Sequence, residues 1–471
     1  MRTLITHGTI VTAGGTLDAD VLIDGETIAA IADPIREPAD RIIDARGMLV
    51  LPGGIDVHTH LGLEAGDIAT ADDFESGTIA AACGGTTTVV DYATQSRRQS
   101  LTRALEAWRA KADGRAAVDY GFHLAVTNLA PAAEAELDRV RAEGVTSFKV
   151  YMAYPGRLML DDRSIARLLA WTAASGALVC VHAENGPAIA ELVARALAEG
   201  RTAPRYHAVT RPVAFEREAV GRVISLAERA GTSVYIVHLS SADGLEEIHS
   251  ARARGVRAFA ETCPQYLVLS DELYDAPGAE AAKYVMSPPL RPPWHQHALW
   301  EGLASGDVQV VSTDHCPFLL EDKLRHLDDF SRIPNGAPGI ETRMSLIYDA
   351  GVRTGRITVT RFVEVTATAP AKIFGLHPQK GEVAVGSDAD LVVFDPGRTL
   401  RLSAATHHMR ADYSAYEGRE VTGAPVAVLS RGRVVAEHGQ FTGRPGWGRF
   451  IARSAAGMHG EARDRRGHHG A

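Results

Sequence analysis

The rhythm of the chain between residues 53 and 375 constrains its fold more than any other feature. Short runs rich in β-branched residues alternate there with longer stretches of helical character, such as 101–112, 133–143, 164–174 and 214–230. Eight candidate strands follow one another, at residues 54–60, 86–93, 120–127, 145–153, 177–184, 233–240, 257–266 and 308–314. Eight strand–helix units predict an α/β fold, a TIM (β/α)8 barrel, with an open doubly wound sheet as the alternative.

The two ends of the chain have a different pattern. Short apolar bursts are separated there by Asp-Gly, Gly-Gly and Gly-Ser turns, which are typical of hairpins. This pattern predicts a small β-sandwich domain formed by the N- and C-terminal segments. We therefore expect a first sandwich part at 1–52, a catalytic barrel at 53–375, a second sandwich part with a C-terminal extension at 376–447, and a flexible polar tail at 448–471.

Composition narrows the class of protein. Apolar residues make up 45% of the 471 residues, which is enough for a large buried core and argues against intrinsic disorder. The formal net charge of −9 argues against a nucleic-acid or anionic-membrane partner. The four cysteines are widely spaced, and the chain has neither a long apolar run nor a signal-peptide pattern at its start. We expect a cytoplasmic protein.

Metal-ligating side chains recur at the ends of the candidate strands. His58 and His60 stand two residues apart and therefore share one face of the first strand. His182, His238 and Asp314 lie at the ends of the fifth, sixth and eighth strands. In a TIM barrel these ends meet at the functional rim, and imidazole with carboxylate suits zinc and related divalent ions. The alternative is a structural barrel in which each histidine merely packs, but such clustering makes that improbable.

Lys149 is an unusual member of this set because its strand is otherwise apolar. In the simplest interpretation the lysine extends to the surface at the end of the strand. Four neutral imidazoles and one carboxylate, however, leave two dications short of negative charge. An anionic bridging ligand at Lys149 would balance them, although the residues alone leave its chemistry open.

Five longer motifs are specific enough to indicate a family. They are residues 52–60 (PGGIDVHTH), 147–154 (SFKVYMAY), 261–267 (ETCPQYL), 284–291 (YVMSPPLR) and 312–318 (STDHCPF). With these motifs in this order, the chain resembles the dihydropyrimidinases and D-hydantoinases, cyclic amidohydrolases of the amidohydrolase superfamily. The resemblance extends from the N-terminal hairpins to about residue 435.

The resemblance implies a centre of two Zn2+ ions per chain, with other divalent metals as alternatives. Lys149 would be carboxylated by CO2 and bridge both ions. His58, His60 and Asp314 would complete the shell of one metal, and His182 and His238 would hold the other.

The resemblance also implies roles in catalysis and substrate binding. Asp314 would accept a proton from the attacking hydroxide and deliver it to the departing ring nitrogen. Tyr154 would donate to the oxyanion. Ser287 and Asn335 would bind the cyclic amide or imide, largely through backbone groups.

The implied reaction is hydrolysis of a 5,6-dihydropyrimidine or 5-substituted hydantoin to an N-carbamoyl amino acid. The substrate is a small ring, and a homotetramer or homodimer is the expected assembly. Allantoinase or another cyclic amidohydrolase is the alternative. A non-catalytic scaffold related to dihydropyrimidinase is more remote, because such proteins are expected to lack several ligands and all six positions are filled here.

The segment after His60 departs from the family pattern. Hydantoinases often carry Met and Phe there, over the ring substituent, whereas residues 61–68 contain Glu64 and Asp67 and no aromatic residue. This polar character leaves the preferred substituent open and keeps allantoinase among the alternatives. Gly62 stands where dihydroorotase-like enzymes place an arginine, which argues against that group.

Overall fold

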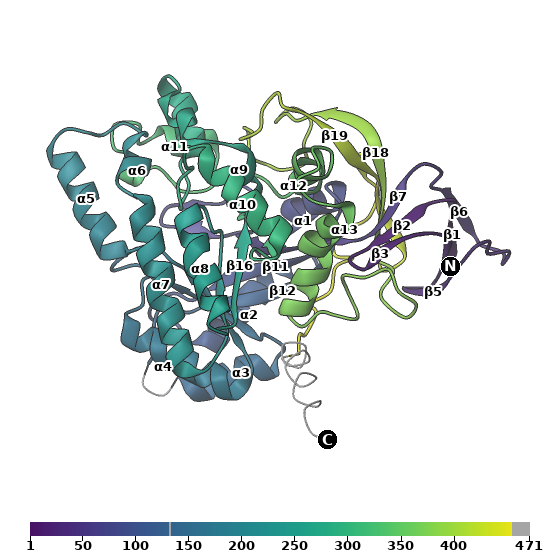
Figure 1. Ribbon diagram of the computed structural model, residues 1–471, viewed down its shortest axis with the longest axis horizontal. Coiled ribbons are helices and arrows are strands. Elements are labelled where there is room, and N and C mark those ends of the chain that lie inside the picture. Colours follow the sequence, from purple (N-terminus) through teal and green to yellow (C-terminus); the bar gives the residue numbers. More distant parts are fainter. Residues whose placement is uncertain (131–132, 455–471) are drawn as a thin grey trace.

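A barrel of eight parallel strands forms the middle of the protein (Figure 1). The structure is a computed structural model that describes residues 1–130 and 133–454. The strands follow sequence order around the barrel: β8 (Gly54–Thr59), β11 (Thr86–Thr94), β12 (Asp119–Ala125), β13 (Ser147–Tyr151), β14 (Leu178–His182), β15 (Val234–Ile236), β16 (Ala258–Thr262) and β17 (Val310–Val311).

The barrel closes between its last and first strands. A parallel bridge pairs Thr59 with His315, just beyond β17, and the Thr313 amide donates to Asp56 Oδ1 at 3.1 Å. The predicted TIM barrel is thereby confirmed, and the open doubly wound sheet is excluded.

Helices cover the outside of the barrel. Their ends follow the local sequence: the Asp161 side chain caps the start of α4, and Gly176 ends that helix in the left-handed region at φ 72°. The longer helices are α1 (Phe74–Cys83), α2 (Leu101–Ala112), α3 (Glu134–Ala142), α4 (Asp162–Ser175), α5 (Gly186–Ala198), α7 (Val213–Ala230), α8 (Ala242–Ala253) and α10 (Trp294–Ser305).

Short helices occupy several connections. The α-helical ones are α6 (Tyr206–Val209), α9 (Pro264–Val268), α11 (Leu320–Leu324), α12 (Arg343–Ile347), α13 (Val359–Val363) and α14 (Ala369–Ile373). The others are the 3-10 helices η1 (Asp271–Asp275), η2 (Gly278–Tyr284) and η3 (Phe330–Arg332), and the π-helices η4 (Tyr348–Val352) and η5 (Glu364–Thr368). The strand predicted to reach residue 266 ends at Thr262, because Pro264 begins α9 at a position that favours a helix start.

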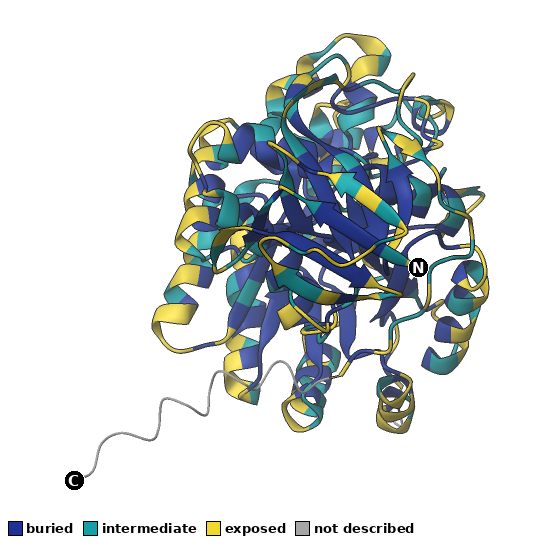
Figure 2. Cartoon of the chain, turned by 90° about the vertical axis from the view of Figure 1, so that its right-hand side faces the viewer, coloured by how far each residue is buried: buried dark blue, intermediate teal, exposed yellow. Residues whose placement is uncertain are grey.

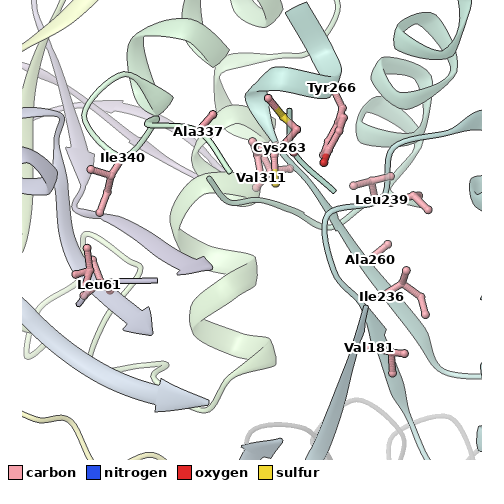
Figure 3. Close-up of a cluster of buried hydrophobic side chains, with 14 of the residues drawn as sticks. Leu61, Val181, Ile236, Leu239, Ala260, Cys263, Tyr266, Val311, Ala337 and Ile340 are labelled. Atoms are coloured by element: carbon pink, nitrogen blue, oxygen red, sulfur yellow. The ribbon is translucent and has the colours of Figure 1, made fainter. Parts of the chain in front are cut away.

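Side-chain alternation along the strands separates the helix-facing layer from the barrel interior. Val181, Ile236 and Ala260 are register partners on three adjacent strands and belong to the large core cluster that includes the covering helices (Figure 3). Their neighbour Cys180 belongs instead to the interior cluster with Tyr235. His182, two residues from Cys180, therefore points inward at the strand end.

Both termini contribute to the β-sandwich, as predicted. One sheet has the order β5-β4-β1-β6, from β1 (Arg2–Thr6), β4 (Asp20–Asp24), β5 (Thr27–Ala32) and β6 (Arg41–Asp44). The other has the order β21-β20-β19-β18-β7-β2-β3, from β2 (Thr9–Thr12), β3 (Gly15–Asp18), β7 (Leu49–Pro52), β18 (Leu391–Arg401), β19 (Glu420–Ser430), β20 (Arg433–Glu437) and β21 (Gln440–Phe441). Antiparallel pairing of β7 with β18 joins the two ends of the chain. The strands are mostly buried, while the outer faces of the helices are exposed (Figure 2).

The C-terminal segment differs from the predicted tail in its first residues. Residues 448–454 lie along the barrel, where the Ile451 amide donates to the Tyr120 carbonyl at 2.7 Å and Arg453 is buried. Residues 455–471 of the predicted tail lie outside the described part of the chain. Among the described helices, none has the length and apolar character needed to cross a bilayer.

Candidate metal centre

The predicted site residues line one pocket at the C-terminal ends of the barrel strands. The pocket has a volume of about 410 Å³. Its lining includes all nine predicted residues: His58, His60, Lys149, Tyr154, His182, His238, Ser287, Asp314 and Asn335. They come from five barrel strands and from the loops after them, so residues up to 277 positions apart in the sequence (335 − 58) meet in space.

Two groups of potential ligand atoms converge in this pocket. In the first, Asp314 Oδ1 lies 3.0 Å from His58 Nε2 and 3.2 Å from His60 Nε2. In the second, His182 Nδ1 lies 2.9 Å from His238 Nε2. Ligand atoms of His58, His238 and Asp314 all lie within 4.8 Å of one another, so the two groups adjoin.

Two buried carboxylates orient the histidine rings. His58 Nδ1 donates to Glu261, whose other oxygen accepts from the Tyr235 hydroxyl at 2.8 Å. Glu184 lies 2.7 Å from His182 Nε2. Each carboxylate occupies one ring nitrogen and leaves the other directed at the pocket, as is usual for metal-ligating histidines. Sequence reasoning missed both roles, although Glu261 lies in a quoted motif and Glu184 follows His182 by two residues.

The donor set fits a divalent metal. His58 Nε2 is buried and accepts no hydrogen bond, so it is an unsatisfied nitrogen aimed at a carboxylate and further imidazoles. Imidazole and carboxylate ligands are those that zinc and similar ions prefer. The chemistry of these residues therefore supports metal binding at the centre of the pocket.

Lys149 is buried at this centre and forms no ion pair within the described part of the chain. Its side chain is 1% exposed, and its Nζ makes no hydrogen bond or ion pair to any residue in the described part of the chain. The rings of Tyr92 and Tyr151 flank Nζ at 4.7 and 5.2 Å. Burial lowers the pKa of Lys149 to about 8, although nearby Asp314 and Glu261 oppose that shift.

The charge states of Asp314 and Tyr154 follow from their surroundings. Burial tends to raise the pKa of Asp314, but His58 and His60 outweigh it and hold that pKa well below its ordinary value. Asp314 is thus an ionised carboxylate. Burial, reinforced by Glu184, raises the pKa of Tyr154 to about 12, so its phenol keeps its proton and remains a donor.

Backbone strain concentrates at the same place. Among the described non-glycine residues, six have positive φ, and three of these are Tyr154 (64°), His238 (39°) and Asp314 (53°). Side chains other than glycine rarely adopt this conformation, and it persists where the surrounding structure enforces it, often at functional sites.

The loop after His60 has an apolar inner side, which corrects the predicted polar character. It forms a small hairpin of β9 (Glu64–Ala65) and β10 (Ile68–Ala69). Leu63, Ala65 and Ile68 line the pocket. Glu64 is exposed and pairs with Lys111 at 3.1 Å, and Asp67 is exposed as well. The sequence shows two carboxylates in this loop but not that the hairpin turns them towards solvent.

The fold and the site together define a TIM-barrel hydrolase with a histidine- and aspartate-rich metal centre. Comparisons agree: residues 49–435 match the model of the amidohydrolase family. The D-hydantoinase of Geobacillus stearothermophilus is 48% identical over 97% of this chain and 98% of its own, and that of Streptomyces coelicolor is 49% identical over 96% and 98%. The crystal structure of dihydropyrimidinase from Brevibacillus agri superposes with a TM-score of 0.95, at 48% identity, covering 97% of this chain and 99% of that one.

The chain therefore belongs to the amidohydrolase family and, within it, to the group of D-hydantoinases and dihydropyrimidinases.

Proposed function

We propose that this protein hydrolyses the cyclic amide bond of 5-substituted hydantoins and 5,6-dihydropyrimidines to give N-carbamoyl amino acids. Relatives named D-hydantoinase and dihydropyrimidinase match nearly the whole chain, and their names support this reaction. The observation that carries the proposal is the convergence of four histidines, Asp314 and Lys149 on one pocket.

Two zinc ions are the proposed cofactor. His58, His60 and Asp314 would hold one ion, and His182 and His238 the other. The neutral Lys149 amine would attack the carbon of CO2, forming an N–C bond as one C=O π bond opens and releasing its proton to solvent, and the resulting carbamate would be a ligand shared by both ions. The lowered pKa of Lys149 supports this step, because only the unprotonated amine is nucleophilic. When bound, the ions would polarise the ring carbonyl and acidify water.

The chain's own residues would then guide the reaction. Asp314 would accept the proton of the attacking water and return it to the ring nitrogen as the C–N bond breaks. Tyr154 would donate its phenol proton to the carbonyl oxygen as charge develops there. Backbone groups of Ser287 and Asn335 would orient the ring, since both residues line the pocket.

Part of the pocket would suit an apolar ring substituent. Leu63, Ala65, Ile68, Leu158 and Phe318 line it, as do the polar Arg157, His326, Ser331 and Arg332, whereas Glu64 and Asp67 do not. Allantoinase activity, on a ring with a polar ureido group, is the alternative. A non-catalytic scaffold is disfavoured because all six ligand positions are filled.

Steady-state turnover across a panel of rings tests the proposal. The panel contains hydantoin, both enantiomers of a 5-aryl hydantoin, dihydrouracil, dihydrothymine and allantoin, and zinc per chain is measured by mass spectrometry on the same preparation. We expect ring opening of at least one hydantoin or dihydropyrimidine. A preparation with two zinc ions per chain that opened none of them would overturn the assignment, and turnover of allantoin alone would replace it.

Two further proposals concern the cell and the assembly. The four cysteines are buried and unpaired, which fits a reducing, cytoplasmic compartment. A homotetramer or homodimer rests on the family resemblance. Cell fractionation and light scattering coupled to size exclusion test these proposals.

A further inference from the structure

A second buried lysine lies behind the pocket wall. Lys323 of α11 is fully buried, at 0% exposed, and forms no ion pair within the described part of the chain. Its Nζ donates to the Val285 carbonyl at 2.9 Å and to the Pro334 carbonyl at 2.8 Å. An unpaired buried amine is rare and costly, so its two hydrogen bonds are its main compensation.

The two carbonyls belong to two loops, residues 285–287 and 334–336, which contribute residues to the pocket lining. Val285 precedes Ser287 by two residues, and Pro334 immediately precedes Asn335; Ser287, Pro334 and Asn335 line the pocket. The Gly336 amide also donates to the Val285 carbonyl, at 3.0 Å. Lys323 and Gly336 thus tie the two loops together at the same oxygen.

The other sides of both loops are held as well. His207 Nε2 contacts the Met286 carbonyl at 2.8 Å, which fixes the first loop from behind. The second loop packs against the segment after Asp314: a Cβ on Gly336 of this loop would stand 2.2 Å from the carbonyl oxygen of Cys316. Each loop is therefore held on its other side, and the Lys323 bridge acts together with the Gly336–Val285 hydrogen bond to join them.

We propose that Lys323 is a positioning residue that fixes the distance between the 285–287 and 334–336 loops and thereby the ring size that they accept. The inference rests on the proposed function, because it assumes that both loops bind the ring. Burial lowers the pKa of Lys323 to about 7, which reduces the cost of burying this amine at neutral pH, and either protonation state has enough N–H groups for both carbonyls.

The test is the ratio of kcat/KM for hydantoin, a five-membered ring, to that for dihydrouracil, a six-membered ring. Lys323→Met keeps an unbranched side chain that is one atom shorter, and it removes the donors. Misplaced binding groups change rates by about tenfold or more, so we expect kcat/KM to fall and the ratio to shift by at least about threefold, with zinc content unchanged. The ratio does not depend on the fraction of active enzyme, so a merely structural loss would leave it unmoved.

Lys283→Met is the matched control. Lys283 lies two residues before Val285, but within the described residues its Nζ bonds only to Glu280, at 2.8 Å. We expect wild-type kinetics from it. If Lys323→Met does not fold, Lys323→Gln retains one donor and serves in its place. An unchanged ratio in a folded variant overturns the proposal, whereas wild-type enzyme that opens neither ring contradicts the proposed function instead.

Discussion

The two rims of the barrel each bury a lysine, and the two lysines have opposite surroundings. At the functional rim, Lys149 has no acidic partner in the described chain, and burial lowers its pKa to about 8. Near the opposite rim, Lys380 is equally buried, but its Nζ lies 2.6 Å from Asp119, 2.9 Å from Asp388 and 2.8 Å from Asp390. These acids outweigh burial and raise the pKa of Lys380 above its ordinary value.

The Lys380 cluster joins separate parts of the chain. Asp119 begins β12 of the barrel, and Asp390 directly precedes β18 of the sandwich. Arg431 bonds to Asp119 at 3.1 Å, and the Arg449 amide donates to the same carboxylate at 2.9 Å. The cluster therefore holds the sandwich and the C-terminal segment on the barrel.

The two lysines differ in role: Lys380 stabilises the fold, whereas Lys149 is available for chemistry. A buried charge whose partners are all present stabilises one arrangement, and removing one member leaves the others uncompensated. A buried amine without an ion-pair partner gives the fold no ion-pair stabilisation and is available for reaction. The predictions below test this contrast.

The largest effect is expected at the functional rim. Lys149→Ala removes the proposed bridging ligand, so kcat/KM for hydantoin should fall by about 1,000-fold or more and zinc should fall below two per chain. The free energy of unfolding of the metal-free protein should stay near the wild-type value, because no ion pair is broken. Turnover, mass spectrometry and urea unfolding measure the three quantities. Turnover near the wild-type level would contradict the role proposed for Lys149.

Lys380→Met should produce the opposite pattern. Asp388 and Asp390 lose their cation, and Asp119 keeps Arg431 but loses its second cation, so the free energy of unfolding should fall by about 3–5 kcal/mol. The kcat per zinc-loaded site should remain within about twofold of wild type, because the cluster touches no pocket residue. If the metal-free Lys149→Ala protein were less stable than Lys380→Met, the contrast between the rims would be wrong.

The fold was largely predictable from the sequence because alternation is a local signal. Six of the eight strands lie within their predicted segments, and β11 and β12 extend one residue beyond theirs, since each strand has β-branched residues bounded by turn signals. The lengths of the strands were harder to predict: the segment predicted at 308–314 contains only a two-residue strand, β17. The irregular closure of the barrel through His315 and Asp56 depends on tertiary contacts that local sequence does not encode.

The site was predictable where strand ends, motifs and the family resemblance mark it. The nine residues expected on these grounds line one pocket, but their supporting groups were missed. Glu261 acts on His58 from 203 residues away, and Lys323 reaches Val285 across 38. No periodicity connects such pairs. The orientation of the 61–68 hairpin was also inaccessible, because it depends on which face packs against the barrel.

Tyr154→Phe tests the functional rim with a smaller change. Losing one donor to a developing oxyanion typically lowers kcat by about 100-fold or more, and KM should change much less. Tyr120→Phe is the control, since Tyr120 is also a buried tyrosine but bonds to Asp113 outside the pocket. We expect wild-type kcat from it. Equal losses in both variants would assign the effect to stability rather than to chemistry at the rim.

The smallest expected effect is a pH dependence of stability at the structural rim. Because the folded state raises the pKa of Lys380 above the unfolded value of 10.5, its ion pairs stabilise the fold fully below that pH. Their contribution should decline as pH rises above 10.5, by up to about 1.4 kcal/mol per pH unit. Other lysines and tyrosines titrate there too, so the relevant quantity is the difference in free energy of unfolding between wild type and Lys380→Met. That difference should be constant near pH 9 and should narrow by about 1 kcal/mol by pH 11.5. A difference that stayed constant over this range would mean that the aspartates do not hold the proton on Lys380.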